Sequence, residues 1–229
     1  MRTLALACDY DGTLASEGRV EAETLLDVKR LRGSGRRFLI VTGRVLEDLF
    51  RVFPEARQVC DRIVAENGAL LHRPQSGEDA LLAEPPPERF LAELKSRGVP
   101  FNAGRAIVAT HLPYESAVLD AINASGLDLQ LILNKGSVMV LPTGVDKGTG
   151  LAAALEELAL TPAETVGVGD AENDRSFLER CGVSAAVANA LPAVRERCRL
   201  KLSRPAGAGV RELIGRMLDN DLAALAPPV

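Results

Sequence analysis

The chain has 229 residues, 47% hydrophobic and 25% charged, which is the balance of a globular protein with one large domain or a domain carrying a smaller insert. The net charge of −4 and the scattered basic residues argue against a nucleic-acid partner, and no apolar run approaches the roughly 20 residues of a membrane helix. The N-terminal apolar run is too short for a signal peptide, and the four cysteines lack metal-binding spacing, so we expect a cytoplasmic protein with reduced thiols.

The first part of the chain alternates short apolar runs with segments of helical period. Buried strands are predicted over residues 3–8 and 37–43, and amphipathic helices over 21–35 and 46–54. The segment 62–71 reads as a strand, an Asn-Gly turn and a second short strand.

The composition changes over residues 72–90, which are rich in proline and polar residues and interrupt the alternation. A second pattern follows, with predicted helices over 88–97 and about 114–124, and strands over 106–110, 129–133 and 137–141. The last two strands are joined by residues that suit a hairpin turn. This helix-strand-helix-strand-strand pattern is typical of an inserted lid, so we expect the insert to cover a site.

The first pattern returns at "PTGVDKGTG", residues 142–150. The predicted strands there are 165–170, 183–188 and 200–202, and the predicted helices are 148–159, 173–180, 192–198 and 208–219. Strand-helix alternation implies an α/β fold with a doubly wound, mostly parallel sheet. We expect a core of residues 1–74 and 142–229 and a small inserted α+β cap of residues 75–141.

Ligands on parallel α/β sheets bind at the carboxyl ends of the strands. The residues that follow the predicted core strands, or the return from the insert, are polar apart from one glycine: Asp9, Asp11, Thr42, Gly43, Arg44, Asp146, Lys147, Asp170, Asn173 and Asp174. If the strands are parallel, these groups converge on one edge of the sheet. For Asp146 we favour a helix N-cap that places Lys147 in the first turn.

Crowded carboxylates repel one another and lose hydration, and a hard divalent cation offsets both effects. Mg²⁺ prefers oxygen ligands and binds few carboxylates together with a substrate phosphate. In such a site Asp9 can attack phosphorus, and Asp11 can protonate the leaving oxygen and then activate water. Lys147 would neutralise charge near the transferred group.

Four segments, "DYDGTL", "VTGR", "DKGTG" and "GDAENDRSF", resemble in this order the motifs of the haloacid dehalogenase-like phosphatases. The insert and the "ENGA" turn at 66–69 look like the C2-type cap of the Cof-type branch, subfamily IIB. That branch includes archaeal-type phosphoglycolate phosphatases, sugar phosphatases of the sucrose-phosphatase kind and phosphomannomutases. The short chain and small cap are most similar to the first two.

The resemblance implies Asp9 as nucleophile, Asp11 as acid and base, and Thr42 and Lys147 as phosphate ligands. It implies Mg²⁺ held by Asp9, the Asp11 backbone carbonyl and Asp170, with Asn173 and Asp174 completing that end of the site. Gly43 and Arg44 are further candidate phosphate contacts, and Lys135 at the predicted hairpin tip is a candidate substrate contact. The segment 203–210 departs from the family pattern.

The expected function is Mg²⁺-dependent hydrolysis of a small phosphorylated metabolite, phosphoglycolate or a sugar phosphate, through an aspartyl-phosphate on Asp9. A sugar phosphomutase is one alternative, although it needs a larger cap that keeps water out. A phosphorylated receiver-like module that is not an enzyme is another, against which the paired aspartates and the insert argue. The expected partner is a small phosphomonoester, and the protein is a monomer or a homodimer.

Overall fold

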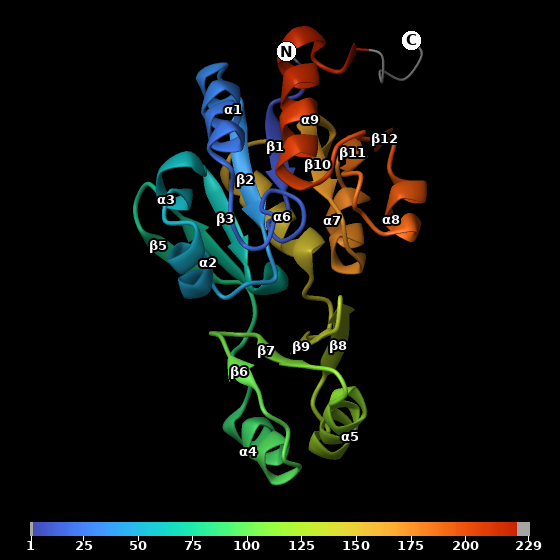
Figure 1. The fold of residues 1–229 in the computed structure, drawn as a ribbon. Coiled ribbons are helices and arrows are strands. Elements are labelled where there is room, and N and C mark those ends of the chain that lie inside the picture. The colour runs from blue at the N-terminus through green and yellow to red at the C-terminus, as the bar shows by residue number, and fades with distance from the viewer. Residues whose placement is uncertain (1, 224–229) are drawn as a thin grey trace.

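The computed structural model describes residues 2–223, which form a larger core and a smaller cap (Figure 1). The core contains an eight-stranded sheet in the order β12-β11-β10-β1-β2-β3-β4-β5. Six strands are parallel: β1 (Ala5–Cys8), β2 (Arg37–Val41), β3 (Arg62–Ala65), β10 (Thr165–Gly169), β11 (Val183–Ala186) and β12 (Leu200–Lys201). The strands β4 (Leu70–Arg73) and β5 (Glu78–Leu81) add an antiparallel edge. The central strand β1 is completely buried, as a continuous apolar run predicts.

Helices cover both faces of this sheet, as Figure 1 shows. On one face α1 (Ala22–Gly33) packs against α9 (Ala206–Asn220), and on the other α6 (Lys147–Glu157) packs against α7 (Arg175–Leu178). The shorter elements are α2 (Leu46–Val52), α3 (Ala56–Val59), α8 (Pro192–Arg197) and the 3₁₀ turns η1 (Glu66–Gly68), η2 (Pro162–Glu164) and η3 (Glu172–Asp174). The predicted α/β class with a doubly wound core is confirmed.

The cap has a four-stranded antiparallel sheet in the order β6-β7-β9-β8. Its elements are α4 (Glu88–Ser96), β6 (Asn102–Ala103), β7 (Val108–His111), α5 (Glu115–Ser125), β8 (Leu129–Asn134) and β9 (Ser137–Pro142). Side chains of β9 alternate: Val138 and Val140 pack beneath α4 and α5, whereas Met139 and Leu141 face the core. One face of the cap sheet therefore covers the end of the core sheet (Figure 1).

The predicted helices and strands are confirmed apart from their ends, but four short elements were missed: α3, β5, β6 and the 3₁₀ turn η2. β5 pairs with β4, so residues 78–81 join the larger sheet although they lie within the range 75–141 expected for the cap. The domain ranges stay a prediction, and the last residues of 142–229 lie outside the described part of the chain.

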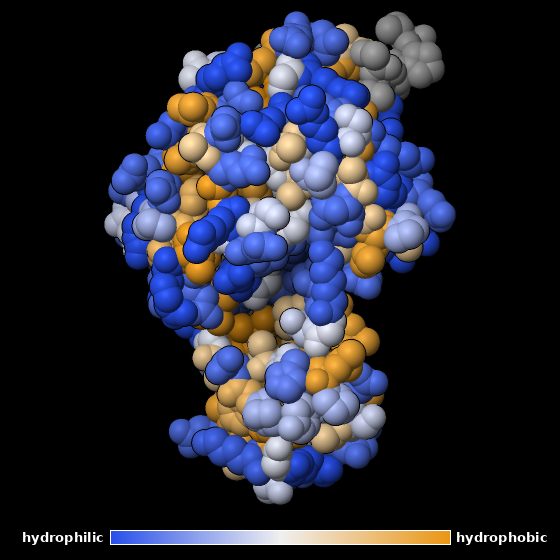
Figure 2. Space-filling view, in the orientation of Figure 1, coloured by the Kyte–Doolittle hydropathy of each residue, from blue (hydrophilic) through white to orange (hydrophobic). Residues whose placement is uncertain are grey.

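The core and the cap meet at a narrow waist, where Figure 2 shows hydrophobic residues between hydrophilic ones. A small apolar cluster at this junction contains Ala69 of the core and Ala106, Ile107, Met139 and Leu141 of the cap. Within residues 2–223, no helix combines the length and the apolar composition that crossing a membrane requires.

The two ends of the described chain are joined through Asp221, which follows α9. Its carboxylate accepts hydrogen bonds from the backbone of Arg2 and Thr3, from the Thr3 hydroxyl, and from Arg36 Nη2 at 2.9 Å. Burial alone would raise the pKa of Asp221, but these donors outweigh it and lower the pKa. Because the ionised form is the one that binds, its contribution to stability is present above the unfolded-state pKa and is lost as pH falls towards the folded one.

We therefore expect Asp221→Asn to lower the free energy of unfolding by about 1–2 kcal/mol at pH 7. Asparagine tolerates the left-handed backbone of this residue (φ 54°), so the change is confined to the carboxylate. Urea denaturation at several pH values measures the difference between variant and wild type, which should shrink below about pH 4. A difference that is constant from pH 7 to pH 3 would contradict this assignment.

Candidate active site

The ends of the central strands carry the candidate site. Asp9 follows β1, Thr42 follows β2, Glu66 follows β3 and Asp170 follows β10. Because β1 pairs in parallel with both β2 and β10, these residues emerge at the same edge of the sheet, which faces the cap.

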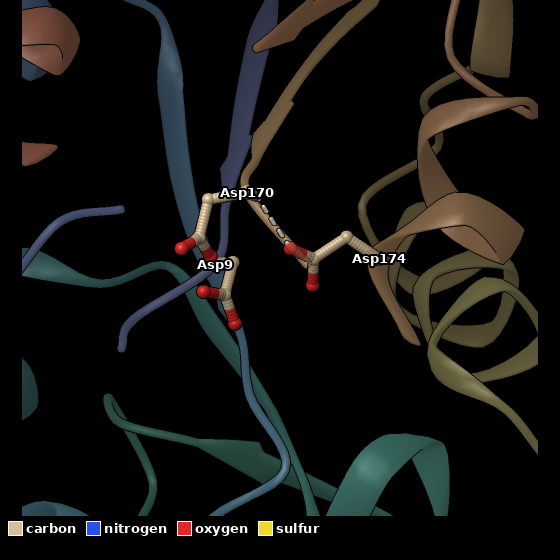
Figure 3. Close-up of side chains that lie close together, drawn as sticks. All are labelled: Asp9, Asp170 and Asp174. Atoms are coloured by element: carbon tan, nitrogen blue, oxygen red, sulfur yellow. Dashed lines mark hydrogen bonds between the residues drawn. The ribbon is translucent and has the colours of Figure 1, made fainter. Parts of the chain in front are cut away.

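Asp9, Asp170 and Asp174 form a cluster of carboxylates (Figure 3), each offering an oxygen within 4.8 Å of the others. All three side chains are buried. Glycines make room for the cluster: a Cβ on Gly169 would lie 2.6 Å from Asp174 Oδ2, and one on Gly12 would lie 2.4 Å from Asp170 Oδ2. Gly12 also has a φ of +84°, which favours glycine, so the "DGT" turn that follows Asp9 is tight for a physical reason.

Lys147 holds this cluster together from the first turn of α6. Its Nζ lies 2.5 Å from Asp9 Oδ1 and 2.5 Å from Asp174 Oδ1, and its side chain is buried. Asp146 caps the helix, as predicted, by accepting the Thr149 N–H at 2.9 Å. A Cβ on Gly148 would lie 2.5 Å from the carbonyl oxygen of Ser176, so this glycine lets α6 approach α7 and lets Lys147 reach the cluster.

The electrostatics of the cluster favour a bound cation. Burial and the Asp174 carboxylate raise the pKa of Asp9 to about 8, although Lys147 opposes the rise. Burial by itself would lower the pKa of Lys147, but Asp174 and Asp9 outweigh it and raise the pKa, so the lysine stays charged. Burial raises the pKa of Asp170 as well, against the pull of Lys135. Lys147 and Lys135 therefore do not compensate all three of the crowded carboxylates.

The side chain of Asp11 lies outside this carboxylate cluster. Arg44 binds it in a bidentate pair, with Nε 2.7 Å from Oδ2 and Nη2 2.7 Å from Oδ1. This hydrogen bonding raises the pKa of Arg44, and the guanidinium also lies 5.4 Å from the ring centre of Tyr10. The sequence placed Asp11 and Arg44 at the same edge but gave no sign that they pair.

The other predicted phosphate contacts lie around the same edge. Thr42 is buried, and its Oγ1 accepts the Arg44 N–H at 3.1 Å. Asn173 Nδ2 donates to Asn67 Oδ1 at 2.9 Å, whereas Asn173 Oδ1 is buried without a partner among the described residues. A Cβ on Gly43 would meet Met139 Sδ at 3.4 Å, Asn173 Nδ2 at 3.7 Å and Asn67 Oδ1 at 3.9 Å, so Gly43 lies between the cap and the site loops.

The cap contributes Lys135 from the tip of the β8–β9 hairpin. Lys135 and Gly136 have φ values of 46° and 85°, as a two-residue type I′ turn requires. The Lys135 ammonium forms an ion pair with Asp170. A pocket of about 360 Å³ lies between the core and the cap, lined by Asp9, Asp11, Gly43, Arg44, Ala109, Asn134, Lys135, Ser137, Met139 and Lys147.

The donor set fits a divalent metal ion. Asp9 and Asp170 offer hard carboxylate oxygens, which Mg²⁺ and similar ions prefer. Both oxygens of Asp174 are already engaged, one by Lys147 and the other by the N–H groups of Asp170 and Ala171 at 2.8 and 2.9 Å. Asp174 thus orients Lys147 and the loop that carries Asp170, besides lying within reach of the same ion.

Several contacts at this edge were not assigned to the site from the sequence. The buried Thr13 donates to Asp170 Oδ1 at 3.1 Å, and Asn189 Nδ2 donates to the Gly12 carbonyl at 2.8 Å. Asn134 contributes a buried Oδ1 that has no partner among residues 2–223. Two signals were visible in the sequence: the threonine of "DGT" directly follows the glycine of the tight turn, and Asn134 lies beside Lys135 at the predicted hairpin tip.

The model of the haloacid dehalogenase-like hydrolases matches residues 6–103 and 130–214. The chain is 31% identical to a phosphoglycolate phosphatase of Methanothermobacter thermautotrophicus over 228 residues, which cover 93% of this chain and 98% of the relative. It is 25% identical to phosphoglycolate phosphatase 2 of Saccharolobus solfataricus over 225 residues, 95% and 94% of the two chains. A solved subclass IIB sugar phosphatase of the same superfamily has the same fold, with a TM-score of 0.76, 18% identity and coverage of 94% and 99%. The resemblance read from the four motifs is confirmed, and the chain belongs to the haloacid dehalogenase-like hydrolases.

Proposed function

We propose that the protein is a Mg²⁺-dependent phosphatase that hydrolyses a small phosphomonoester through an aspartyl-phosphate on Asp9. One observation carries the proposal: Asp9 lies beside Lys147 in a buried carboxylate cluster, at the sheet edge that opens into the pocket beneath the cap. A nucleophile, a fixed positive charge and candidate metal ligands at one point are what phosphoryl transfer needs.

Asp9 and Asp11 divide the chemistry between them. A carboxylate oxygen of Asp9 forms a bond to phosphorus while the bond to the leaving oxygen breaks, and that oxygen takes a proton from Asp11. Water then gives a proton to Asp11 and attacks phosphorus, which releases phosphate and restores Asp9. Because Arg44 holds both oxygens of Asp11, the pair must open for this transfer, and an incoming phosphate competes for the guanidinium.

Asp9, the backbone carbonyl of Asp11 and Asp170 would hold Mg²⁺, with Asp174 supporting them. The bound ion would offset the charge of the cluster and of the phosphate oxygens. Lys147, Thr42, the backbone of Gly43 and Asn173 would bind the remaining phosphate oxygens. Lys135 now pairs with Asp170, one of the residues that would hold the ion, so with the ion in place its ammonium would be available to the substrate.

Phosphoglycolate is the first candidate substrate and a sugar phosphate the second. The names of the two curated relatives and the sugar phosphatase of the same fold support these candidates. The pocket is small, and Lys135, Asn134 and Ser137 line its cap side, where a carboxylate or hydroxyl of the leaving group would lie. Membership of the hydrolase family argues against the receiver-like alternative. The cytoplasmic location and the monomeric or homodimeric state stay predictions.

Phosphate release from a metabolite panel tests the proposal, with phosphoglycolate, sugar phosphates and p-nitrophenyl phosphate as substrates. We expect release with Mg²⁺ and its loss with EDTA, restored by excess Mg²⁺. An isomerised sugar phosphate without free phosphate would instead identify a phosphomutase. If no substrate on the panel is turned over by the folded protein in Mg²⁺, the proposed function is wrong.

Lys135→Ala should weaken recognition of the leaving group. We expect a KM for phosphoglycolate that is about 10- to 100-fold higher, because a charge-assisted hydrogen bond to the carboxylate is lost. The KM for p-nitrophenyl phosphate, whose leaving group has no carboxylate, should change less than about threefold. Lys95→Ala removes an exposed cap lysine on α4 and serves as the matched control. Equal effects on both substrates would contradict a role for Lys135 in substrate choice.

A further inference from the structure

The carboxylate of Glu66 belongs to the core, but it binds the backbone of the cap. The side chain is fully buried. Oε1 accepts the N–H of Arg105 at 2.9 Å, and Oε2 accepts those of Ala106 at 2.7 Å and Ile107 at 3.0 Å. A buried carboxylate needs such donors to offset its lost hydration, and here all three come from the loop between β6 and β7.

The cap loop is shaped around this carboxylate. A Cβ on Gly104 would lie 2.6 Å from Glu66 Oε1, so only glycine leaves room for the side chain. The Gly104 N–H donates to the Ile107 carbonyl at 2.8 Å, which closes the loop and turns three successive N–H groups towards one point. Ala106 and Ile107 then pack against Ala69 of the core.

The backbone around Glu66 is held in an unusual conformation. Glu66, Asn67 and Gly68 have φ values of 51°, 54° and 108°, which places three successive residues in the left-handed region. L-residues other than glycine keep such a conformation only where their surroundings impose it. Here the Glu66 N–H donates to the Arg44 carbonyl at 2.9 Å, and the Asn67 N–H donates to the Thr42 carbonyl at 2.9 Å.

The same turn reaches the other loops of the site. Asn67 Oδ1 accepts Asn173 Nδ2 at 2.9 Å. A Cβ on Gly68 would lie 1.9 Å from the Asp146 carbonyl oxygen, so the turn lies directly against the residue that precedes Lys147. The turn 66–68 therefore contacts three catalytic loops through its backbone and Asn67, and the cap through Glu66.

We propose that Glu66 is a positioning residue that fixes the cap on the core and couples its orientation to the loops carrying Thr42, Lys147 and Asn173. Glu66 touches neither the pocket nor the carboxylate cluster; it acts through the 104–107 loop, from which β7 leads to Ala109 in the pocket lining. The kinetic consequence rests on the proposed phosphatase function, whereas the structural consequence does not.

Amide hydrogen exchange tests the structural part without any need for activity. In Glu66→Ala, peptides covering residues 102–109 should exchange about tenfold faster or more, because three N–H groups lose their acceptor. Peptides from β1 and β10 should exchange as in wild type. Glu66→Gln keeps one acceptor oxygen and should give an intermediate rate. Gly104→Ala should resemble Glu66→Ala, whereas Gly215→Ala on α9, with open space around it, is the matched control.

Steady-state kinetics test the coupling. Glu66→Ala should lower kcat/KM for phosphoglycolate by about tenfold or more, with partial recovery in Glu66→Gln and no loss in Gly215→Ala. The proposal is overturned if exchange over 102–109 is unchanged in both Glu66→Gln and Gly104→Ala, or if it rises equally in β1 and β10. It is also overturned if exchange rises but kcat/KM does not change. A wild type inactive on every substrate refutes the proposed function, and exchange alone then decides the role of Glu66.

Discussion

Asp9→Asn is expected to lower kcat by about 10⁴-fold or more, because the amide cannot form the aspartyl-phosphate. The substitution is almost isosteric and removes one negative charge from a buried cluster. It should therefore leave the fold intact and raise the thermal midpoint, because burial and Asp174 already disfavour the ionised form of Asp9. Phosphate release with saturating p-nitrophenyl phosphate and Mg²⁺ measures the effect.

A matched control separates the nucleophile from a general loss of negative charge. Asp27→Asn removes a carboxylate of α1 that pairs with Arg30 on the surface at 2.8 Å, and it should keep wild-type kcat. Intact mass after rapid quenching should show a phosphorylated species, 80 Da heavier, in wild type but not in Asp9→Asn. Activity within tenfold of wild type in the folded Asp9→Asn protein would exclude Asp9 as the nucleophile.

Lys147→Met should give the largest loss of stability. The substitution leaves Asp9 and Asp174 buried without the cation that now lies 2.5 Å from each. Breaking a buried ion pair by removing one partner lowers the free energy of unfolding by about 3–5 kcal/mol, and urea denaturation measures this directly. Activity should fall by about 10³-fold, because the charge that balances the transferred group is gone.

The loss of stability in Lys147→Met should depend on pH, and the carboxylates left without a partner determine the direction of that dependence. Burial raises the pKa of Asp9, and without Lys147 nothing on this lysine's side opposes the rise. As pH falls, Asp9 therefore binds a proton in the folded protein at a higher pH than in the unfolded chain. The stability of Lys147→Met should therefore fall as pH rises from about 5 to 8. The double variant Lys147→Met/Asp174→Asn should recover about 1 kcal/mol or more, since one unpaired charge has been removed. Additive effects of the two substitutions would show that they do not interact.

The carboxylate cluster could be predicted from the sequence because it depends on few assumptions. Asp9 and Asp170 are far apart in the chain, but each directly follows an apolar run that reads as a buried parallel strand. The carboxyl ends of parallel strands lie at one edge whatever the details of the helices between them. The closeness of the two residues therefore follows from strand direction and order alone.

The edge strand β5 shows where the local pattern fails. Its sequence, Glu78 to Leu81, lies in a polar segment beside prolines and reads as a connection. It becomes a strand because β4 offers a free edge, and its side chains are exposed or half-buried. Pairing with a partner, not intrinsic propensity, determines such a strand.

The cap contacts could not be predicted for a different reason. A hairpin tip at Lys135 was visible in the sequence, but its distance from Asp170 depends on how the whole cap is rotated on the core. The Asn-Gly turn was likewise visible, whereas the partners of the Glu66 carboxylate lie on a loop about 40 residues further along the chain. Contacts of this kind are fixed by tertiary packing, for which a single sequence carries no periodic signal.

The position of the cap within the chain also affects how the protein is made. β1 lies between β2 and β10, and every residue of the cap is synthesised after β2 and before β10. During synthesis on the ribosome, the edge of β1 that pairs with β10 therefore stays unpaired until the cap and then β10 have left the exit tunnel. Long-range parallel pairing of this sort slows folding and exposes nascent chains to aggregation. An insert that folds early by itself, from its own local hairpin and helices, shortens the effective distance between the two halves of the core.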